Sequence, residues 1–491
     1  MSQHLPLAPM PLFPIYLLRD NTVLTISPAI PEILKMLSFQ EKSMAQASGP
    51  KKEKIRLFEI VKDGPLGPVA MTYHGLWKRV KEFAESLGYR VEVQDHRPPF
   101  PRMHLERMFG FRGTQRQWLI SGLRHDESGL IGAPTRYGKT TGILNTIRAC
   151  DEELPIVVTA PGKDLIKQLA DDVISAFSHR RPKLLKGKPV ASNLIICSLD
   201  SLHHCDRTRT QLVIIDEPHA TAASSRIPQI KEFANARKIG FGASLSGRYD
   251  QRDLVIEGLI GPILTNKTYR EGVAEGMICP ISVIHVDLVF DPWNCEDRNT
   301  VMNYLLYQSP RVAKVAKFIS DSLPEKWQTL MFIKNEKQAE FFHGQMQDAR
   351  VPIAMAKRLT TVGRRELTEA VKQSEVNRAF CSDIWVQGVT FSNLRVLMNL
   401  SGGGPYTSVI QKPGRLAEIR PELNKRRGIL VDVTMRPSWN PKSREMPGQA
   451  WRGIVHEGQS RIQAYETIGY DMFKVQTFAQ LAAQLQEFIH E

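Results

Sequence analysis

The segment that most constrains this 491-residue chain runs from Ile131 to Thr141 and reads IGAPTRYGKTT. Its triplet Gly138-Lys139-Thr140 has the residue types and the order found at the end of a phosphate-binding loop. The glycine lets backbone N–H groups close around phosphate oxygens, the lysine reaches the β- and γ-phosphates, and the threonine hydroxyl binds Mg²⁺. Because Ala133 stands where such a loop usually has its first glycine, the assignment depends on partner motifs elsewhere.

The surrounding pattern places this loop between a strand and a helix. Leu130-Ile131 reads as the end of a short buried strand, and residues 141–150 read as the helix that follows. The positive N-terminal end of that helix favours bound phosphate. The predicted phosphate and Mg²⁺ ligands of an ATP site are therefore Gly138, Lys139, Thr140 and Thr141.

A second motif supplies the carboxylates that such a site needs. The apolar run 212–215 leads directly into Asp216-Glu217-Pro218-His219. A strand that ends in two carboxylates is typical of the Walker B motif, in which Asp216 would hold Mg²⁺ and Glu217 would polarise the attacking water. Gln115, which precedes the loop, can hydrogen-bond adenine through both groups of its amide. The sequence therefore predicts that ATP and Mg²⁺ are the cofactors.

Composition favours a polyanionic partner. The chain has 65 Lys and Arg residues against 51 Asp and Glu residues, which gives a formal charge of +14 and a pI of about 9.4. The sequence lacks a run of about 18 apolar residues, and its N-terminus lacks the basic-then-apolar layout of a secretory signal. The six cysteines are scattered without a CxxC pair, which suits reduced thiols. We therefore expect a cytoplasmic protein that does not span a membrane.

Alternating strands and helices predict the fold class. The alternation runs from residue 111 to about 280, which indicates a doubly wound parallel sheet, and it restarts with predicted strands at 329–333, 378–382, 396–400 and 428–433. We predict an α/β protein with two such lobes in tandem, preceded by a small α+β domain. The predicted parts are an N-terminal module (1–108), lobe 1 (109–283), lobe 2 (284–455) and a C-terminal helical extension (456–491). The proline-rich stretch 96–101 marks the first boundary.

In number, order and spacing, these motifs resemble those of the superfamily 2 helicases. The matching positions are Gln115, residues 133–140, Pro161 with Leu165 and Gln168, residues 216–219, 242–244, 261–262 and 276–280, Ser382-Asp383 with Gly388, and Gln411 with Gly414 and Arg415. The resemblance covers about residues 111–435. It implies that the two sheets are RecA-like lobes, with ATP bound by the first lobe and enclosed by the second.

The resemblance also implies roles for residues of lobe 2. Gly388 would lie near the nucleotide, and Gln411 and Arg415 would act in catalysis. The family has a second arginine at the position of Glu418, and in this chain Arg420 lies two residues later. The arginine that stabilises charge on the γ-phosphate therefore stays open between Arg415 and Arg420.

The N-terminal module resembles the small DNA-binding domain of phage recombination helicases of the UvsW type. The matches are residues 54–58, Gly75-Leu76 and 88–91, and the C-terminal pair Arg461 and Tyr465 with Gly469-Tyr470 fits the same group. Backbone phosphates attract basic and loop residues without reading sequence. The predicted nucleic-acid contacts are Lys78 and Arg79 of the module, Pro161, Gly162, Lys163 and Ser198 of lobe 1, and Lys334 and Asn335 of lobe 2.

These features predict a monomeric, ATP-dependent DNA helicase or translocase. Its substrate would be branched DNA in replication, recombination or repair, within the cytoplasm of a bacterium or a phage-infected host. Two alternatives stay open. One is an RNA helicase with the same motor. The other is a nucleic-acid remodelling subunit whose ATPase is weak or vestigial, because Glu418 replaces an arginine.

Overall fold

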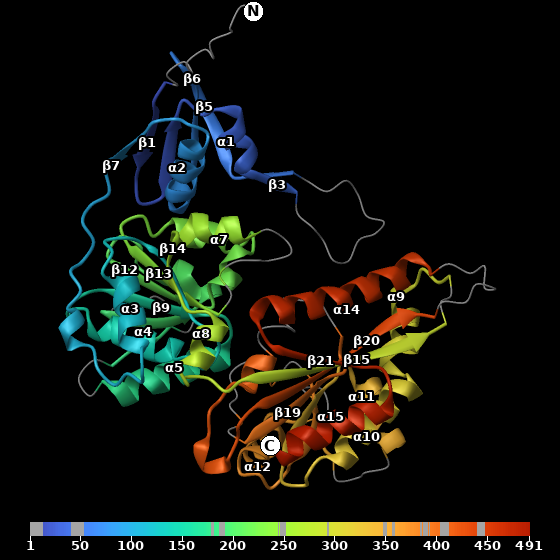
Figure 1. Ribbon diagram of the computed structural model, residues 1–491. Coiled ribbons are helices and arrows are strands. Elements are labelled where there is room, and N and C mark those ends of the chain that lie inside the picture. Colours follow the sequence, from blue (N-terminus) through green and yellow to red (C-terminus); the bar gives the residue numbers. More distant parts are fainter. Residues whose placement is uncertain are drawn as a thin grey trace, which may run out of the picture. The chain divides into compact units, whose positions relative to one another are not determined.

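The computed structural model of the chain contains two compact units (Figure 1). Among the described residues, the first takes those up to Ala133 and those from Lys139 to Asn266, and the second takes 134–138 and those from Lys267 onward. The structure describes residues 13–40, 54–177, 181–185, 192–243, 245, 252–291, 294–346, 351–355, 359–382, 385, 391, 393–402, 412–438 and 447–491. Among the helices of these ranges, none is both long enough and apolar enough to cross a bilayer.

The first unit begins with a small α+β module. Its five-stranded sheet has the order β5-β6-β2-β1-β7, in which β1 pairs in parallel with β7 and the other pairs are antiparallel. Side chains of β1 alternate between buried and exposed, because only one face of this sheet is covered. The strands are β1 (Ile15–Arg19), β2 (Val23–Ser27), β5 (Phe58–Gly64), β6 (Gly67–Tyr73) and β7 (Val91–Asp95), with the two-stranded pair β3 (Ser38–Gln40) and β4 (Lys54–Arg56). The helices are α1 (Pro31–Met36) and α2 (Trp77–Ser86), the latter preceded by the 3-10 turn η1 (His74–Leu76).

The remainder of the first unit is lobe 1, a seven-stranded parallel sheet. Its order is β10-β11-β9-β12-β13-β8-β14. The central strands are buried along their length, because helices cover both faces. The strands are β8 (Gly129–Gly132), β9 (Ile156–Ala160), β10 (Lys183–Leu184), β11 (Leu194–Ser198), β12 (Leu212–Asp216), β13 (Arg237–Gly242) and β14 (Ile263–Asn266). The helices are α3 (Gln115–Leu123), α4 (Lys139–Arg148), α5 (Lys163–Ala176), α6 (Ile227–Lys231) and α7 (Asp253–Ile260).

The second unit contains lobe 2, again a seven-stranded parallel sheet, of order β17-β18-β16-β19-β20-β15-β21. The two parallel sheets and the small module confirm the predicted fold class. The strands are β15 (Ile281–Phe290), β16 (Gln328–Phe332), β17 (Ile353–Ala354), β18 (Arg378–Cys381), β19 (Leu394–Asn399), β20 (Gly428–Pro437) and β21 (Asp471–Val475). The helices are α8 (Tyr269–Ala274), α9 (Arg298–Met302), α10 (Pro310–Ser322), α11 (Glu336–Met346), α12 (Thr361–Lys372), α14 (Gln449–Ile468) and α15 (Phe478–His490).

The C-terminal segment differs from the expected helical extension. It contains β21, which pairs in parallel with β15 at the edge of the lobe 2 sheet. The proposed boundary between 283 and 284 falls inside β15, and the one between 455 and 456 falls inside α14. Sequence periodicity missed β21 because the strand has only five residues, and two of them, Asp471 and Lys474, are charged and exposed.

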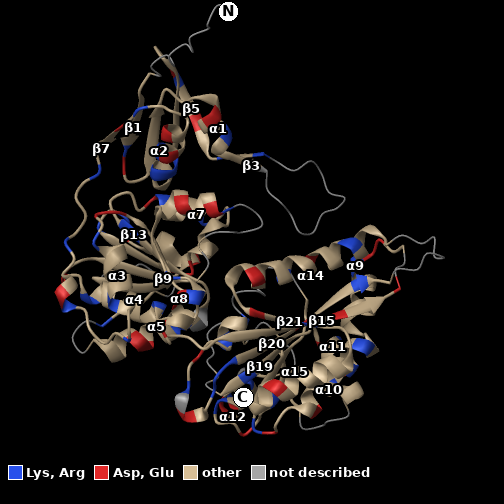
Figure 2. Cartoon of the chain, viewed as in Figure 1, with Lys and Arg blue, Asp and Glu red and all other residues tan. Residues whose placement is uncertain are grey.

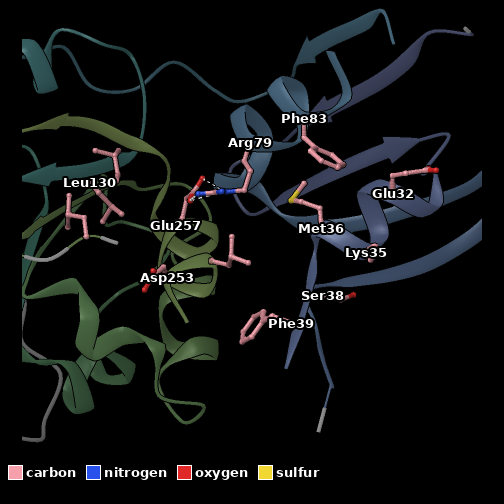
Figure 3. Close-up of a pocket in the computed structure, with 13 residues that line it drawn as sticks. Glu32, Lys35, Met36, Ser38, Phe39, Arg79, Phe83, Leu130, Asp253 and Glu257 are labelled. Atoms are coloured by element: carbon pink, nitrogen blue, oxygen red, sulfur yellow. Dashed lines mark hydrogen bonds and ion pairs between the residues drawn. The ribbon is translucent and has the colours of Figure 1, made fainter. Parts of the chain in front are cut away.

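The N-terminal module packs directly onto lobe 1 through η1, α2 and α7 (Figure 3). The Arg79 guanidinium donates to the Glu257 carboxylate at 2.6 and 3.1 Å, and a His74 ring nitrogen lies 3.1 Å from the Leu259 carbonyl oxygen. Burial lowers the pKa of His74 well below its usual range, which favours the neutral ring. The module is therefore joined to lobe 1 by a packed interface as well as by the proline-rich linker.

One apolar core runs through this interface. It includes Ile15 and Leu17 of the module together with Ile256 and Leu259 of α7. Beside it lies a cavity of about 730 Å³, lined from the module by residues such as Phe39 and from lobe 1 by α7 (Figure 3). The sequence did not indicate this shared core, because the apolar faces of two α/β parts read alike whether they pack together or separately.

The backbone of Gly75 lies so close to lobe 1 that a larger residue at this position should destabilise the interface. A Cβ atom added to Gly75 would lie 1.9 Å from the Glu257 carbonyl oxygen and 2.8 Å from the Gly261 Cα. We expect Gly75→Ala to destabilise the first unit by about 1–3 kcal/mol or more, because overpacked sites must shift backbone. Differential scanning calorimetry would show this as a lower Tm for one transition.

The matched control for this prediction is Gly344→Ala on α11. Its added Cβ would meet nothing within 4 Å, and alanine favours a helix. This variant should keep or slightly raise the Tm. Equal Tm values for Gly75→Ala and the wild type would contradict the packed interface.

Candidate nucleotide-binding site

The predicted phosphate loop connects β8 to α4. The strand ends at Gly132 and the helix begins at Lys139, so the loop occupies residues 133–138. Gly138 has a φ of 120° and Arg136 a φ of 72°, both in the left-handed region. Positive φ values in such a loop turn successive N–H groups toward one side, where they can bind an anion. For the non-glycine Arg136 this conformation costs energy, which is typical of functional loops.

Two parallel strands bring the predicted carboxylates to this loop. The order β12-β13-β8 places the ends of β12 and β8 on either side of β13, where Asp216 pairs with Phe241 and Gly132 with Gly242. The carboxyl ends of parallel strands meet at one edge, where ligands bind in such folds. The sheet register therefore explains why motifs far apart in sequence share one site.

Lys139, Glu217 and His219 form a charged cluster at this edge. The Lys139 Nζ lies 3.9 Å from Glu217 Oε1, and His219 Nδ1 lies 3.2 Å from Glu217 Oε2. Glu217 has a φ of 53°, and its N–H donates to the Phe241 carbonyl oxygen at 2.9 Å. A positive φ at a non-glycine residue is strained, as is common at functional sites. The structure thus brings Lys139 close to Glu217, the residue that follows Asp216.

Electrostatics at Asp216 favour a bound cation. Burial and the neighbouring Glu217 carboxylate raise the pKa of Asp216 to about 7, against the opposing effect of Lys139. Within the described ranges, no group of three His, Cys, Asp or Glu residues gathers to hold a metal. Mg²⁺ is usually bound through one or two protein oxygens and keeps several waters. Asp216 with the Thr140 hydroxyl fits that pattern.

Gln115 lies at the first residue of α3 and is almost fully buried. Its Oε1 accepts a hydrogen bond from the Arg112 N–H at 2.8 Å, which fixes the orientation of the amide. Trp118, one turn later, donates from Nε1 to the Gly132 carbonyl oxygen at 2.7 Å. This bond ties α3 to the end of β8. Sequence analysis missed Trp118, since a buried tryptophan on a helix reads only as core.

Arg415 ends the short 3-10 turn η7 (Pro413–Arg415) of the second unit. A Cβ on Gly414 would lie 2.6 Å from the Thr135 side chain, which explains a glycine there. Gln411 of the same motif and Gly388, which belongs to the motif before it, lie outside the described residues. Their predicted roles stay predictions.

Glu418 joins two arginines within the second unit, which also takes residues 134–138. Its Oε1 lies 2.6 Å from Arg420 Nη2, and its Oε2 lies 3.5 Å from Arg136 Nη2. Arg420 also approaches Glu422 at 3.4 Å. Arg136 of the phosphate loop and Glu418, which stands where the family has an arginine, are thus oppositely charged partners. Sequence comparison of single motifs could not reveal this pairing.

The predicted nucleic-acid contacts occupy loops after parallel strands. Gly162, with a φ of 96°, follows β9, and the Ser198 hydroxyl at the end of β11 lies 2.8 Å from that of Ser201. Asn335 follows β16, and its Oδ1 accepts from the Gln338 N–H at the start of α11. Pro161 and Lys334 lie beside them, and the side chain of Lys163 lies outside the described residues. Their contacts with nucleic acid stay predictions.

The two basic residues predicted on α2 differ in their surroundings. Lys78 is exposed and lies 3.9 Å from Glu82 one turn away. The Arg79 guanidinium is bound by the Glu257 carboxylate, so its role in the structure is to hold the module on lobe 1 (Figure 3). Figure 2 shows that Lys and Arg residues are spread over the module and both lobes. Residue type alone did not separate an interface arginine from a surface lysine.

The cluster and the two parallel sheets match the arrangement expected of a phosphate-loop protein with two α/β lobes. A family model described as "Type III restriction enzyme, res subunit" matches residues 102–246. The protein "Putative helicase 22" of Sulfolobus islandicus filamentous virus (isolate Iceland/Hveragerdi) is 25% identical over 344 residues, which is 62% of this chain and 60% of that protein. These matches confirm the predicted resemblance to the superfamily 2 helicases.

A solved structure repeats the fold. A fragment described as "a putative HsdR subunit of a type I restriction enzyme", from Vibrio vulnificus YJ016, has a TM-score of 0.58 at 15% identity, over 90% of this chain and 95% of that one. T4 UvsW gives a TM-score of 0.40 at 15% identity, over 94% of this chain and 99% of that one. The HsdR fragment therefore shares the fold of this chain.

Substitution of Lys139 and substitution of Glu217 should cause different defects in ATP binding and hydrolysis. Lys139→Ala removes the ammonium at the start of α4, so we expect ATP binding and hydrolysis to be lost. Glu217→Gln keeps Asp216 and Lys139, so we expect near-normal binding of a fluorescent ATP analogue with no turnover. Lys372→Ala, which changes an exposed lysine on α12, is the control and should behave as wild type. Turnover in either cluster variant would contradict the site.

Proposed function

We propose that the protein is an ATP-dependent DNA helicase or translocase that acts on branched DNA, such as replication forks and recombination intermediates. The observation that carries the proposal is the meeting of Lys139 with Asp216 and Glu217 in a chain that has a second parallel-sheet lobe. The viral relative supports the helicase class, and the net charge of +14 supports a nucleic-acid partner. The UvsW-like motifs of the N-terminal module support branched DNA.

In this proposal, the residues of lobe 1 bind and activate ATP. Lys139 and the N–H groups at the start of α4 would bind the β- and γ-phosphates, and Gln115 would contact adenine. Asp216 and Thr140 would hold Mg²⁺, which when bound neutralises charge on the phosphates. Glu217, oriented by His219, would position a water and accept its proton. ATP would draw lobe 2 over this site.

Arg415 is the stronger candidate for the arginine that meets the γ-phosphate. It keeps the Gly-Arg spacing of the family motif, whereas Arg420 is held by Glu418 at 2.6 Å and approaches Glu422 at 3.4 Å. An arginine that two carboxylates already bind must give up both pairs before it can reach phosphate. Glu418 thus favours a structural part for Arg420.

The proposed DNA path follows the loops after β9, β11 and β16. These loops offer backbone N–H groups, hydroxyls and Lys334, which suit phosphate contacts rather than base readout. Binding should therefore depend strongly on salt and weakly on sequence. We place this activity in a monomer in the cytoplasm of a bacterium or an infected host cell, where the viral relative also points.

The arginine assignment predicts unequal effects of two substitutions. Arg415→Ala should lower the ATPase kcat by about 10³- to 10⁵-fold, the usual cost of losing an arginine finger, with nucleotide binding largely kept. Arg420→Ala should have a much smaller effect, since it leaves Glu418 with Arg136. Steady-state kinetics of both variants would test this. A larger defect in Arg420→Ala would overturn the assignment.

The substrate assignment is tested by ATPase and binding assays on a panel of nucleic acids. We expect stimulation by single-stranded, forked and four-way DNA above that by linear duplex or RNA. Greater stimulation by RNA would favour an RNA helicase. No stimulation by any member would favour a remodelling subunit with a vestigial ATPase.

The role of the N-terminal module in DNA binding is tested by point substitution, because deletion would cut through the core that the module shares with lobe 1. Lys78→Gln should weaken binding to forked DNA and reduce the salt slope by about 0.9, the value for one lost phosphate contact. Lys372→Gln on α12 is the matched control. An unchanged slope in Lys78→Gln would remove this residue from the DNA contacts.

A further inference from the structure

A connected set of buried polar side chains links α14 to the segment that carries Arg415. The set, here called the Asp432 network, lies within the second unit, and each member is 6% exposed or less. Its members are Asn399, Ser401, Lys412, Asp432, Arg461 and Tyr465. Sequence analysis noted Arg461 and Tyr465 only as a family feature, without a function.

One half of the network converges on the Asp432 carboxylate at β20. Arg461 donates from Nε to Oδ2 at 2.8 Å and from Nη2 to Oδ1 at 3.0 Å, and the Tyr465 hydroxyl donates to Oδ2 at 2.8 Å. The four-residue spacing puts Arg461 and Tyr465 on one face of α14, toward the same carboxylate. Burial and Asp432 raise the pKa of the Tyr465 hydroxyl well above its usual range, so it remains a donor.

The other half of the network connects Asp432 to Lys412 through Asn399. Asn399 donates from Nδ2 to Asp432 Oδ1 at 3.3 Å and accepts at Oδ1 from Lys412 Nζ at 3.3 Å. Lys412 Nζ also donates to the Ser401 hydroxyl at 2.6 Å. The amide of Asn399 thus faces an anion with its N–H group and a cation with its oxygen. These opposite demands fix its orientation, as a relay between two buried charges requires.

Lys412 is the N-cap residue that immediately precedes η7. The Arg415 N–H donates to the Lys412 carbonyl oxygen at 3.1 Å, and the Leu416 N–H donates to the Pro413 carbonyl oxygen at 2.8 Å. A fixed Lys412 side chain therefore sets the position of the turn and, through the turn, the position of Arg415. Buried charges seldom add net stability, yet they specify one arrangement because leaving a partner unpaired is costly.

We infer that Asp432, Arg461 and Tyr465 are positioning residues for Arg415, acting through Asn399 and Lys412. This inference rests on the proposed catalytic part of Arg415. It gives α14, which lies far from η7 in the sequence, a function in nucleotide hydrolysis. The network is the physical connection by which a change at α14 would reach the arginine.

Tyr465→Phe is the test variant, because it removes one hydroxyl and leaves the ring in the core. We expect its ATPase kcat to fall about tenfold, since hydrogen bonds to charged groups are the stronger ones. The KM for ATP should change by less than about twofold, because Lys139 and Gln115 are untouched. Tyr470→Phe is the matched control, since its ring lies 5.9 Å from that of Tyr465 and outside the network.

A double-mutant cycle separates positioning from general stability. If Tyr465 acts through Arg415, then Tyr465→Phe should cause no further loss of kcat in an Arg415→Ala background. The same fractional loss in both backgrounds, or an equal loss in Tyr470→Phe, would overturn the inference.

Hydrogen exchange gives a readout that does not need activity. The N–H groups of Arg415 and Leu416 should exchange faster in Tyr465→Phe and in Lys412→Met than in the wild type or Tyr470→Phe. Unchanged exchange would overturn the positioning role. Faster exchange in a protein without nucleic-acid-stimulated ATPase would leave the positioning role supported and the proposed function wrong.

Discussion

The approach of the Lys139 ammonium to the Glu217 carboxylate is the interaction on which the proposed chemistry depends. It exists because β8 and β12 are parallel neighbours of β13, so their carboxyl ends reach the same edge of the sheet. Neither side chain would be stable alone in this partly buried place, since isolated charges are costly to desolvate. The lysine and the two carboxylates offset one another.

Charged side chains away from the site are also paired with opposite charges. Arg79 is bound by Glu257 where the module meets lobe 1, Glu418 lies between Arg136 and Arg420, and Asp432 is held by Arg461. Each carboxylate is near an arginine supplied by a different element or segment. Ion pairs of this kind fix geometry more than they add stability. They explain how a chain with Glu418 in place of the family's arginine can keep a defined loop.

The N-terminal module shares one apolar core with lobe 1. With η1 against α7 and Gly75 close to the Glu257 backbone, the module is part of the body that carries the phosphate loop strand. A DNA-binding surface on α2 would then be rigidly linked to β8. The exposed Lys78 and the interface residue Arg79 are neighbours in sequence with different surroundings, because one faces solvent and the other α7.

Local periodicity and short motifs with fixed chemistry suffice to predict the two parallel sheets, the phosphate loop and the strand that ends in Asp216. The pairings between distant residues depend on tertiary contacts. Only the fold showed that Arg136 and Glu418 are partners, that Arg461 and Tyr465 meet one carboxylate, and that the module shares a core with lobe 1. Such contacts join residues far apart in the chain, and a residue type does not reveal which distant charge or surface it will meet.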